Sequence, residues 1–497
     1  MLRRLGRLED AANAGKAAVA LNPNSVEAHN NAANALKELN RAGEAEQHFR
    51  KAVALRPDYA DAWSNLSGLL STTGQAREAE RCARQAIACD PNNANSHNFL
   101  GTALLLQERL PEAGAAFAQA LALKPDFALA HSNYLFCANY RTDLSPEQIF
   151  AEYKRWDATH AQPLIPANPA WPNTRDPKRR LRVGYFSPDF RYHAVSFFIE
   201  PLLAAHDRGE IELFLYSEVA APDVVTERFR ALADHWRLTI GLSDDAMAEM
   251  IRKDGIDVLV DLAGHTASNR LLVFARRPAP VQVTHIVGHG YTTGLSAIDA
   301  VLGDAAMMPE GSDHLFSERV MRLDRIPLVY APPPGLPAPS PLPALANGHI
   351  TFGCFSRTAR INDGVISAWA QILAAVPGSR LVLNSKPFQE DATRAAFAAR
   401  FAVHGIAPER LDLIYTTPQP RTWDAYSTID IALDPFPHNA GTTTIEALWL
   451  GVPVVSLADR PSVGRFGATI LGAVGMSDWV AQDLPAYVAR AIEAGSD

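Results

Sequence analysis

Hydrophobic residues follow two different patterns along the 497-residue chain. Up to Tyr140 they have the spacing of paired amphipathic helices. From Leu181 onward, short apolar runs alternate with helical stretches, as in the run Ile256-Asp-Val-Leu-Val-Asp-Leu-Ala263. Such runs are typical of buried strands in parallel sheets that helices cover on both faces. The pattern therefore predicts an all-helical first part and an α/β second part.

The helical part is built from a repeat. Four prolines stand 34 residues apart: Pro23, Pro57, Pro91 and Pro125. This period is the signature of tetratricopeptide repeats, each a pair of antiparallel helices. Small residues recur where the two helices approach closely, at Ala45, Ala52, Ala79, Ala86, Ala113 and Ala120, and large ones fill the gaps, at Phe49, Trp63, Leu66, Leu100 and Phe117. We expect a solenoid over residues 1–140 that binds another protein.

A row of amides marks the first helix of the repeats. Asn31, Asn65 and Asn133 occupy the same repeat position, and Phe99 interrupts the row although Asn98 stands next to it. A side-chain amide offers both a donor and an acceptor, so a spaced row can bind the backbone of an extended peptide. The alternative is that these amides satisfy backbone groups between repeats.

The remaining chain divides into a linker and two lobes. We expect a helix at 144–160 within a linker over 141–180, a first α/β lobe over 181–345 and a second over 346–497. The expected strands are 182–187, 212–217, 256–263 and 280–287 in the first lobe, and 350–355, 380–384, 411–415, 429–433 and 452–457 in the second. Two doubly wound lobes predict a ligand site at the carboxyl ends of the strands. No G-x-G-x-x-G follows either first strand, which argues against a dinucleotide redox enzyme.

Composition narrows the classes of partner. The net charge of −8 gives no support for nucleic acid or an anionic membrane as a partner. No apolar run approaches the roughly 18 residues of a membrane span, and residues 1–10 lack the apolar centre of a signal peptide. The cysteines show no metal-ligand spacing and predict a reduced, cytoplasmic protein; they are Cys82, Cys89, Cys137 and Cys354.

The strongest local signal for chemistry is the segment Asp434-Pro-Phe-Pro-His-Asn-Ala-Gly-Thr-Thr-Thr-Ile-Glu446-Ala-Leu-Trp-Leu-Gly451. A strand ends at Asp434 and a helix begins near Thr442, so free N–H groups and outward-facing hydroxyls meet at a helix N-terminus. Such a terminus binds anions, and Glu446, one turn on, suits two ribose hydroxyls. An ordinary helix cap is the alternative. The residues predicted to bind a diphosphate are Gly441, Thr442, Thr443 and Thr444.

Several stretches together resemble one family of glycosyltransferases. They are Gly184–His193, Gly264–Leu271, Arg277–Val283, Thr292–Leu295, Thr351–Gly353, Ser385–Phe388 and Asp434–Gly451. With the repeats in front of them, they resemble the family of O-linked N-acetylglucosamine transferase and plant SPINDLY. The resemblance implies an all-α repeat solenoid followed by an α/β GT-B fold, which is two Rossmann-like lobes. The details are more similar to SPINDLY, a protein O-fucosyltransferase, than to its relative that uses UDP-N-acetylglucosamine.

The resemblance also implies roles for residues of the first lobe. His193 matches the active-site histidine that faces the acceptor hydroxyl, as general base or as a positioning group. Asp189, four residues earlier, is expected to orient its ring. His265, and the loop that carries His289 and Tyr291, match segments that face the sugar-diphosphate. The loop 285–294 is one residue longer than in SPINDLY, which weakens the comparison there.

In the second lobe, Thr442, Thr443 and Glu446 match the donor contacts. Arg360 stands where the family has an essential lysine that neutralises the departing nucleoside diphosphate; arginine keeps the charge but is longer and planar. Lys386 is expected to share this task, although a structural ion pair is the alternative for both cations. Contacts to the base are expected near Thr416.

The resulting prediction is an inverting protein O-glycosyltransferase. It would move N-acetylglucosamine or fucose from a UDP- or GDP-sugar to a serine or threonine of a protein held by the repeats. No D-x-D motif ends a strand, because Asp244-Asp245 begins a helix, so we expect no metal or other cofactor. The alternatives are a non-catalytic adaptor with a vestigial nucleotide-sugar site, and a nucleotide-sugar epimerase. A first repeat without its first helix (Gly6, Ala11 and Ala18 fit its second) and an end at Asp497 predict truncation at both ends.

Overall fold

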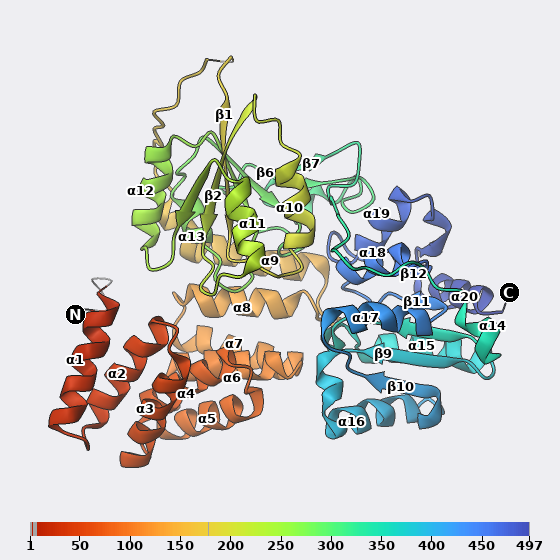
Figure 1. The fold of residues 1–497 in the computed structure, drawn as a ribbon, viewed down its shortest axis with the longest axis horizontal. Helices are drawn as coiled ribbons and strands as arrows, with labels where there is room; N and C mark the ends of the chain where they lie inside the picture. The colour runs from red at the N-terminus through yellow and green to blue at the C-terminus, as the bar shows by residue number, and fades with distance from the viewer. Residues whose placement is uncertain (1, 3–6, 177, 497) are drawn as a thin grey trace.

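The computed structural model describes residues 2, 7–176 and 178–496, and it consists of a helical solenoid and two α/β lobes. Gly6, Met1 and Asp497 lie outside the described residues. In Figure 1 the N-terminal lobe lies above the solenoid, with helix α9 (Pro146–Trp156) between them, and the C-terminal lobe lies to the right of both. The fold is therefore a tetratricopeptide-repeat solenoid followed by two Rossmann-like lobes of GT-B type, as the sequence predicted.

Antiparallel helix pairs form the solenoid, and small residues set their distance. The alanines that the repeat places at close approaches, such as Ala79 and Ala86, are fully buried. A Cβ atom on Gly68 would lie 2.8 Å from the ring of Phe99, so a larger residue there would force this ring to move. The helices are α1 (Leu8–Leu21), α2 (Val26–Glu38), α3 (Ala42–Leu55), α4 (Ala60–Thr72), α5 (Ala76–Cys89), α6 (Ala94–Leu106), α7 (Leu110–Leu123) and α8 (Ala128–Ala138).

Helix α9 (Pro146–Trp156) joins the solenoid to the N-terminal lobe and continues as a π-helical turn, Asp157–Ala161. Ser145 and Gln148 form a capping box at its start. Tyr153 and Trp156 are buried in a core that also contains residues of the N-terminal lobe. The helix predicted at 144–160 is confirmed, and it forms part of the floor of this lobe.

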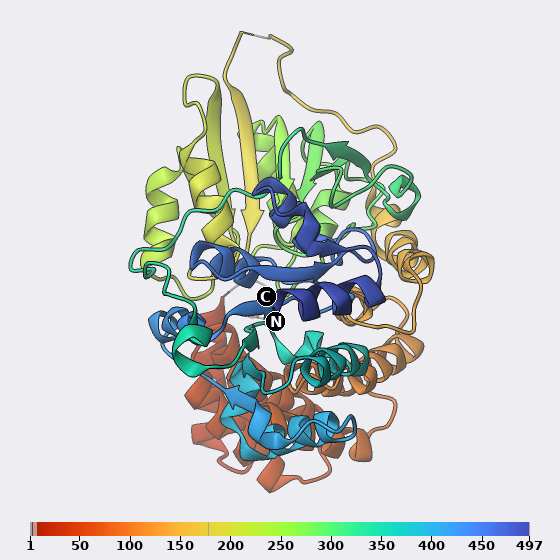
Figure 2. The ribbon, with the colours of Figure 1, turned by 90° about the vertical axis from the view of Figure 1, so that its right-hand side faces the viewer.

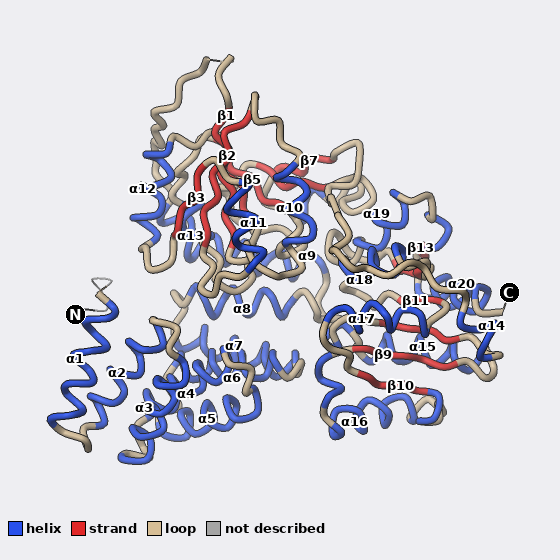
Figure 3. The backbone as a smooth tube through the Cα atoms, viewed as in Figure 1, coloured by secondary structure: helices blue, strands red, loops and turns tan. Residues whose placement is uncertain are grey.

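The N-terminal lobe is one parallel sheet in the order β3-β2-β1-β4-β5-β6-β7. Figure 3 shows its strands separated from those of the second lobe. Its elements are β1 (Leu181–Ser187), α10 (Ser196–Ala204), β2 (Ile211–Ser217), α11 (Val224–Leu232), β3 (His235–Leu238), α12 (Asp244–Asp254), β4 (Val258–Asp261), α13 (Leu271–Ala275), β5 (Val281–His285), β6 (Ala300–Gly303) and β7 (Arg319–Arg322). The order reverses between β1 and β4, where doubly wound sheets place their ligands.

The C-terminal lobe repeats this design in the order β10-β9-β8-β11-β12-β13, again all parallel. Its switch point lies between β8 and β11. Its elements are α14 (Pro343–Asn347), β8 (Thr351–Cys354), α15 (Asp363–Ala375), β9 (Arg380–Asn384), α16 (Asp391–Ala402), β10 (Leu411–Ile414), α17 (Gln419–Ala425), β11 (Ile431–Leu433), α18 (Thr442–Trp449), β12 (Val454–Leu457), α19 (Phe466–Ala473), β13 (Val480–Ala481) and α20 (Leu484–Ala494).

Every predicted strand is present, but four strands escaped the sequence pattern. They are β3, β6, β7 and β13, each four residues long or shorter. Three of them, β3, β7 and β13, are edge strands that need no continuous apolar run. Strand β3, for example, contains His235 and Arg237, whose side chains pair with Glu212 and Asp254.

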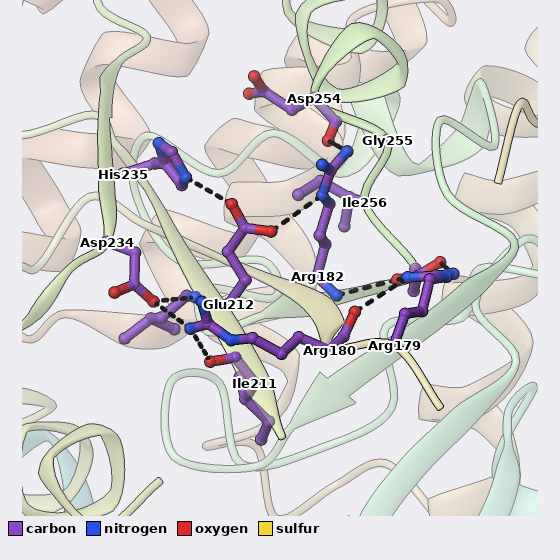
Figure 4. Close-up of polar contacts among 12 residues, drawn as sticks. Arg179, Arg180, Arg182, Ile211, Glu212, Asp234, His235, Asp254, Gly255 and Ile256 are labelled. Carbon is purple, nitrogen blue, oxygen red and sulfur yellow. Dashed lines mark hydrogen bonds and ion pairs between the residues drawn. The ribbon is translucent and has the colours of Figure 1, made fainter. Parts of the chain in front are cut away.

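The linker enters the N-terminal lobe through arginines at the amino ends of the strands. Figure 4 shows Glu212 between Arg182 and His235, with distances of 3.1 and 2.7 Å. In the same view Arg180 reaches the backbone carbonyl of Ile211. Arg179 pairs with the buried carboxylate of Asp257 at 2.5 Å. This network lies at the sheet end opposite to the carboxyl ends and anchors the linker.

The C-terminal lobe also contacts the solenoid directly. Figure 2 shows this lobe in front, reaching down beside the red and orange repeats. Arg77 pairs with Glu390 at 2.5 Å across this contact. In the described part of the chain, no helix is long and apolar enough to cross a membrane. The four cysteines, all described, are free thiols.

Candidate functional site

The predicted donor residues line the carboxyl edge of the second sheet. Thr416 follows β10, Lys386 follows β9, Arg360 follows β8 and Asp434 follows β11. Because these strands are neighbours in this order, the fold brings residues from four separate stretches of sequence onto one edge. Helix α18 begins at the same edge, after the loop from Asp434 to Gly441.

The buried carboxylate of Asp434 holds this loop. One oxygen accepts a hydrogen bond from the backbone N–H of Ala440 at 2.8 Å, and the other accepts one from the Ser456 hydroxyl at 2.7 Å. Burial raises the pKa of Asp434 to about 7, while these hydrogen bonds and the charge of Arg360 oppose the shift. Asp434 therefore shapes the approach to α18 rather than presenting a charge to solvent.

The N-terminus of α18 lies at this edge without a side-chain cap, and its use as an anion site stays a prediction. Its N-cap is Gly441, which has no side chain to cap the helix, so the first N–H groups of the helix have no side-chain acceptor there. Thr442 and Thr443 are partly exposed at this terminus. The prediction that Thr444 also faces outward is wrong. Its side chain is buried and donates a hydrogen bond to the Ala440 carbonyl at 3.0 Å, because each helical residue turns about 100° from the last.

Glu446 lies one turn into α18 and is nearly fully buried. The indole N–H of Trp423 donates to one carboxylate oxygen at 3.0 Å, which fixes the side chain. Trp423 comes from α17, and no motif in the sequence pointed to it. A held carboxylate suits a pair of vicinal hydroxyls, and the ribose contact of Glu446 stays a prediction.

Arg360 lies in a short 3-10 turn, Thr358–Arg360, directly after β8. It donates to the Ser356 hydroxyl at 3.0 Å, and its charge acts on Asp434 and His438 of the donor loop. Its Nε atom is buried without a hydrogen-bond partner among the described residues. The cation therefore lies at the switch point, where its charge acts on the loop that leads into α18.

A second arginine on this turn escaped the sequence reasoning. Arg357 is exposed, and its charge lowers the pKa of His193 in the opposite lobe. No signal in the sequence pointed to Arg357 apart from its position three residues before Arg360. Sequence position alone does not show which residues of the opposite lobe lie near it. The turn thus presents two cations rather than one.

The remaining C-terminal residues are tied to each other. The amide of Asn384 donates to the Thr416 hydroxyl at 2.6 Å and its oxygen accepts from the Thr416 backbone N–H at 3.1 Å. This pair joins the ends of β9 and β10. Lys386 is exposed at the start of the next turn. The structure places both predicted residues at the edge, and their donor contacts stay predictions.

His193 lies in the loop after β1, at the switch point of the first sheet. Burial lowers its pKa, so the ring is neutral near pH 7. Its Nδ1 atom accepts from the Val195 backbone N–H at 3.3 Å and lies 3.6 Å from the Asp189 carboxylate, beyond hydrogen-bond range. A neutral ring that accepts at Nδ1 carries its proton on Nε2, which favours a hydrogen-bond donor over a base.

His265 lies at the interface with the solenoid. It is buried, and its nitrogens contact the Ser132 hydroxyl at 3.0 Å and the Thr293 carbonyl at 2.7 Å. Since both ring nitrogens are bonded, the structure does not support its predicted donor contact; the residue joins α8 to the lobe.

His289 and Tyr291 pack around Tyr153 of the linking helix. His289 Nε2 lies 2.5 Å from the Tyr153 hydroxyl, and the rings of Tyr291 and Tyr153 meet edge to face at 5.2 Å. Gly288 between these segments has no room for a Cβ atom, which would lie 2.0 Å from the Leu262 carbonyl oxygen. The loop therefore packs closely between α9 and the first lobe. The donor contacts of His289 and Tyr291 stay predictions.

The amide row of the repeats is partly self-paired. Asn65 donates to the side chain of Asn30 at 3.1 Å, and Asn133 donates to that of Asn98 at 3.0 Å, each to the preceding repeat. Asn31 is exposed. These bonds agree with the alternative that the amides join repeats, although through side chains rather than backbone. Peptide binding by this row stays a prediction.

No group of three or more histidine, cysteine, aspartate or glutamate side chains within the described residues is arranged to hold a metal ion. Metal independence stays a prediction that needs an experiment.

Comparison with known proteins agrees with this geometry. The sequence model of glycosyl transferase family 41 matches residues 160–328 and 342–497, and tetratricopeptide-repeat models match 2–60 and 38–103. The chain is 38% identical over 373 residues to proteins of Arabidopsis thaliana and Petunia hybrida, each named "Probable UDP-N-acetylglucosamine--peptide N-acetylglucosaminyltransferase SPINDLY". The alignment covers 74% of this chain but only about 40% of those relatives' length.

A solved structure is similar over nearly the whole chain. It is a mutant of the O-GlcNAc transferase of Thermobaculum terrenum, at 37% identity and a TM-score of 0.89. The match covers 95% of this chain and 90% of that one. The similarity therefore extends over the solenoid and both lobes.

Proposed function

This chain belongs to glycosyl transferase family 41, and we propose that it is an inverting protein O-glycosyltransferase. It takes one sugar, N-acetylglucosamine or fucose, from a nucleoside-diphosphate sugar and transfers it to a serine or threonine hydroxyl of a protein held by the repeats. The single observation that carries this proposal is the open N-terminus of α18 beside Arg360 at the switch point of the second sheet.

The second lobe supplies the charge stabilisation that the reaction requires. As the glycosidic bond to the diphosphate breaks, negative charge grows on the departing phosphate. The free N–H groups of α18 and the Arg360 guanidinium stabilise this charge, and Lys386 is close along the same edge. Because these groups are positioned before the reaction begins, they lower the barrier rather than merely binding the donor.

The first lobe receives the acceptor. The hydroxyl oxygen attacks the anomeric carbon on the face opposite the diphosphate, so the new bond has inverted configuration. A neutral His193 is suited to hydrogen-bond the sugar or the acceptor at this point. The Val195 backbone N–H donates to the Nδ1 atom of this ring, and the Asp189 carboxylate lies 3.6 Å from the same atom. The general base that takes the hydroxyl proton is either His193 or another group.

We infer further that turnover needs no metal ion, because the α18 terminus and the arginines supply the positive charge. Transfer in excess EDTA should equal transfer without it. A loss of turnover that Mg²⁺ or Mn²⁺ restores would contradict this. The cytoplasmic location that the cysteines suggest stays a prediction.

The decisive experiment is a thermal-shift panel of the purified chain with UDP, GDP, UDP-N-acetylglucosamine and GDP-fucose. A ligand at 100 times its dissociation constant stabilises a protein by about 2.7 kcal/mol, which moves the melting temperature measurably. A selective shift identifies the donor, and Glu446→Ala should abolish it while Glu409→Ala, an exposed control at the other end of the sheet, should not.

The adaptor alternative gives a different result. A vestigial site would bind a nucleotide but transfer no sugar to any peptide library, whereas an epimerase would convert the donor without an acceptor. Mass spectrometry of the reaction products distinguishes a transferase from an adaptor and from an epimerase. Absence of both a nucleotide shift and a product would contradict the proposed function.

A further inference from the structure

Helix α17 contacts two of the residues that are predicted to bind the donor. The hydroxyl of Thr422 donates to the backbone carbonyl of Thr416 at 2.9 Å. The indole N–H of the next residue, Trp423, donates to a carboxylate oxygen of Glu446 at 3.0 Å. Because these two contacts come from neighbouring residues of one helix, they fix the end of β10 and the carboxylate on α18 relative to each other.

The turn after α17 contacts the first turn of α18. The Tyr426 hydroxyl donates to the backbone carbonyl of Thr443 at 3.2 Å, and the Tyr426 ring lies 4.4 Å from the ring of Phe355 between centroids. Burial, together with the charge of Glu446, raises the pKa of this hydroxyl well above its ordinary value, so it keeps its proton and donates. One short segment thus contacts both the start of α18 and its carboxylate.

Trp423 is held by packing as well as by its hydrogen bond. Its ring is buried in an apolar cluster that includes Ala447 of α18 and Val454 of β12. An apolar ring would fill this cluster equally well, whereas an indole adds one donor and no acceptor. That donor is aimed at Glu446. A carboxylate offers about four acceptor positions, so it can keep the indole bond and also accept from two hydroxyls.

We propose that Trp423 is a positioning residue of the donor site: its indole N–H fixes the Glu446 carboxylate in the orientation that receives both ribose hydroxyls. This inference rests on the proposed function and on its ribose contact. It assigns to Trp423 the selection of ribonucleotides over 2′-deoxyribonucleotides, because a carboxylate that is free to rotate gains less from a pair of vicinal hydroxyls.

Calorimetry of the purified chain with UDP, GDP and their 2′-deoxy forms tests this selection. We expect the ribonucleotide to bind about tenfold or more tightly than its 2′-deoxy form, as hydrogen bonds to a charged group contribute. Trp423→Phe should reduce this preference to about threefold or less. In transfer assays the loss should raise the donor KM and leave kcat nearly unchanged, because the ribose contact is the same before and during bond breaking.

Trp369→Phe is the matched control. It removes a fully buried indole from the same lobe, whose N–H donates to the Tyr487 hydroxyl at 3.0 Å. Tyr487 keeps its own hydrogen bond to the Asp434 backbone carbonyl in this variant. Both variants should melt at a lower temperature, but Trp369→Phe should keep the ribose preference of the unmodified protein. A preference that disappears in both variants would overturn the specific role of Trp423.

A second replacement separates the hydrogen bond from the packing. The amino acid β-(3-benzothienyl)alanine in place of Trp423 keeps the two-ring shape and exchanges only the N–H for sulfur. It should lower the ribose preference as much as Trp423→Phe does, with a smaller loss of melting temperature. It therefore decides the question if Trp423→Phe does not fold. An undiminished preference in this protein would overturn the proposal.

Failure of this inference can be told apart from failure of the proposed function. If the unmodified protein transfers sugar and Trp423→Phe keeps the full ribose preference, the positioning role is overturned while the function stands. If Trp423→Phe loses the preference but the unmodified protein transfers no sugar, the positioning role stands and transfer does not. Equal binding of both forms by the unmodified protein overturns the positioning role, and binding of none of the four nucleotides overturns both proposals.

Discussion

The ring of Tyr140 lies almost parallel to the ring of His438, with centroids 4.7 Å apart and planes 16° from each other. Tyr140 ends the solenoid, and His438 belongs to the loop between Asp434 and Gly441. Next to this stack, Arg460 donates to the backbone carbonyls of Asn139 at 3.0 Å and Arg141 at 2.8 Å. The solenoid is therefore attached to the loop that leads into α18.

Removing this stack should loosen the donor loop. Tyr140→Ala deletes a buried ring, which costs about 3–5 kcal/mol in protein cores, and it leaves the His438 ring without its neighbour. We expect a lower melting temperature and a weaker affinity for UDP or GDP by calorimetry. Tyr140→Phe keeps the ring and serves as the control. Equal nucleotide affinity of the alanine and phenylalanine variants would show that the stack only stabilises the fold.

Arg360→Ala tests the stabilisation of the leaving group. Removing one preorganised donor from a developing anion typically costs about 10²–10³ in kcat. We expect that loss with an unchanged melting temperature, because Arg360 makes one hydrogen bond, to Ser356, and no ion pair within the described residues. Arg360→Lys should recover part of the rate. Transfer of a radiolabelled sugar to a peptide measures this rate. Near-normal transfer by the alanine variant would exclude the role of Arg360 in stabilising the leaving group.

The neutral state of His193 predicts a pH dependence. Burial lowers its pKa and the nearby Asp189 carboxylate opposes that shift. If His193 takes the hydroxyl proton, kcat/KM should fall at acid pH with a midpoint below the ordinary histidine value of about 6.5. A ring that only donates through Nε2 keeps that donor when it is protonated and gives no such acid limb. Asp189→Asn removes the opposing charge, so the midpoint should move to lower pH. A midpoint that stays in place or moves upward would show that the limb belongs to another group.

Asp257 predicts a pH-dependent stability at the far end of the first sheet. Burial acts to raise the pKa of Asp257, but the hydrogen bonds that it accepts from Arg179, the Arg182 backbone N–H and Asn173 outweigh burial, so its pKa is lowered. A carboxyl with a depressed folded-state pKa stabilises the protein above its unfolded pKa of about 3.9, and this stabilisation is lost as the pH falls through the folded value.

Asp257→Asn should therefore destabilise the lobe at pH 7 by about 2 kcal/mol, the worth of hydrogen bonds to a charged group. The difference should shrink toward pH 3 in thermal melts recorded across this range. Asp245→Asn is the control, because the Asp245 carboxylate is largely exposed in its pair with Arg276. A loss that is the same at both pH values would point to packing rather than charge.

Much of the fold could be predicted because its signals are local. The 34-residue period places each alanine at a close approach between two helices, and Ala45 and Ala113 are fully buried as expected. Continuous apolar runs marked the buried strands, and the loop after β11 marked the start of α18. Edge strands such as β3 were missed, because a half-exposed strand shows no such run.

The contacts of polar side chains were harder to predict, because most of their partners are distant in the chain. Thr444 was expected at the anion site but bonds to its own backbone. His265 was expected to face the donor but joins the solenoid to the first lobe through Ser132. Arg357 was not among the predicted site residues. Only the arrangement of the two lobes brings its charge close enough to act on His193.

The sequence by itself determined the repeats, the two parallel sheets and the position of helix α18, since periodicity and strand-loop-helix order are properties of neighbouring residues. Only the tertiary structure decided which groups share the site. It brought Arg360 and Asp434 together because β8 and β11 are adjacent in the sheet, and it brought Tyr140 to His438 because the solenoid packs against the second lobe. Such contacts join residues that are far apart in the chain, 74 positions for Arg360 and Asp434, and no local pattern encodes them.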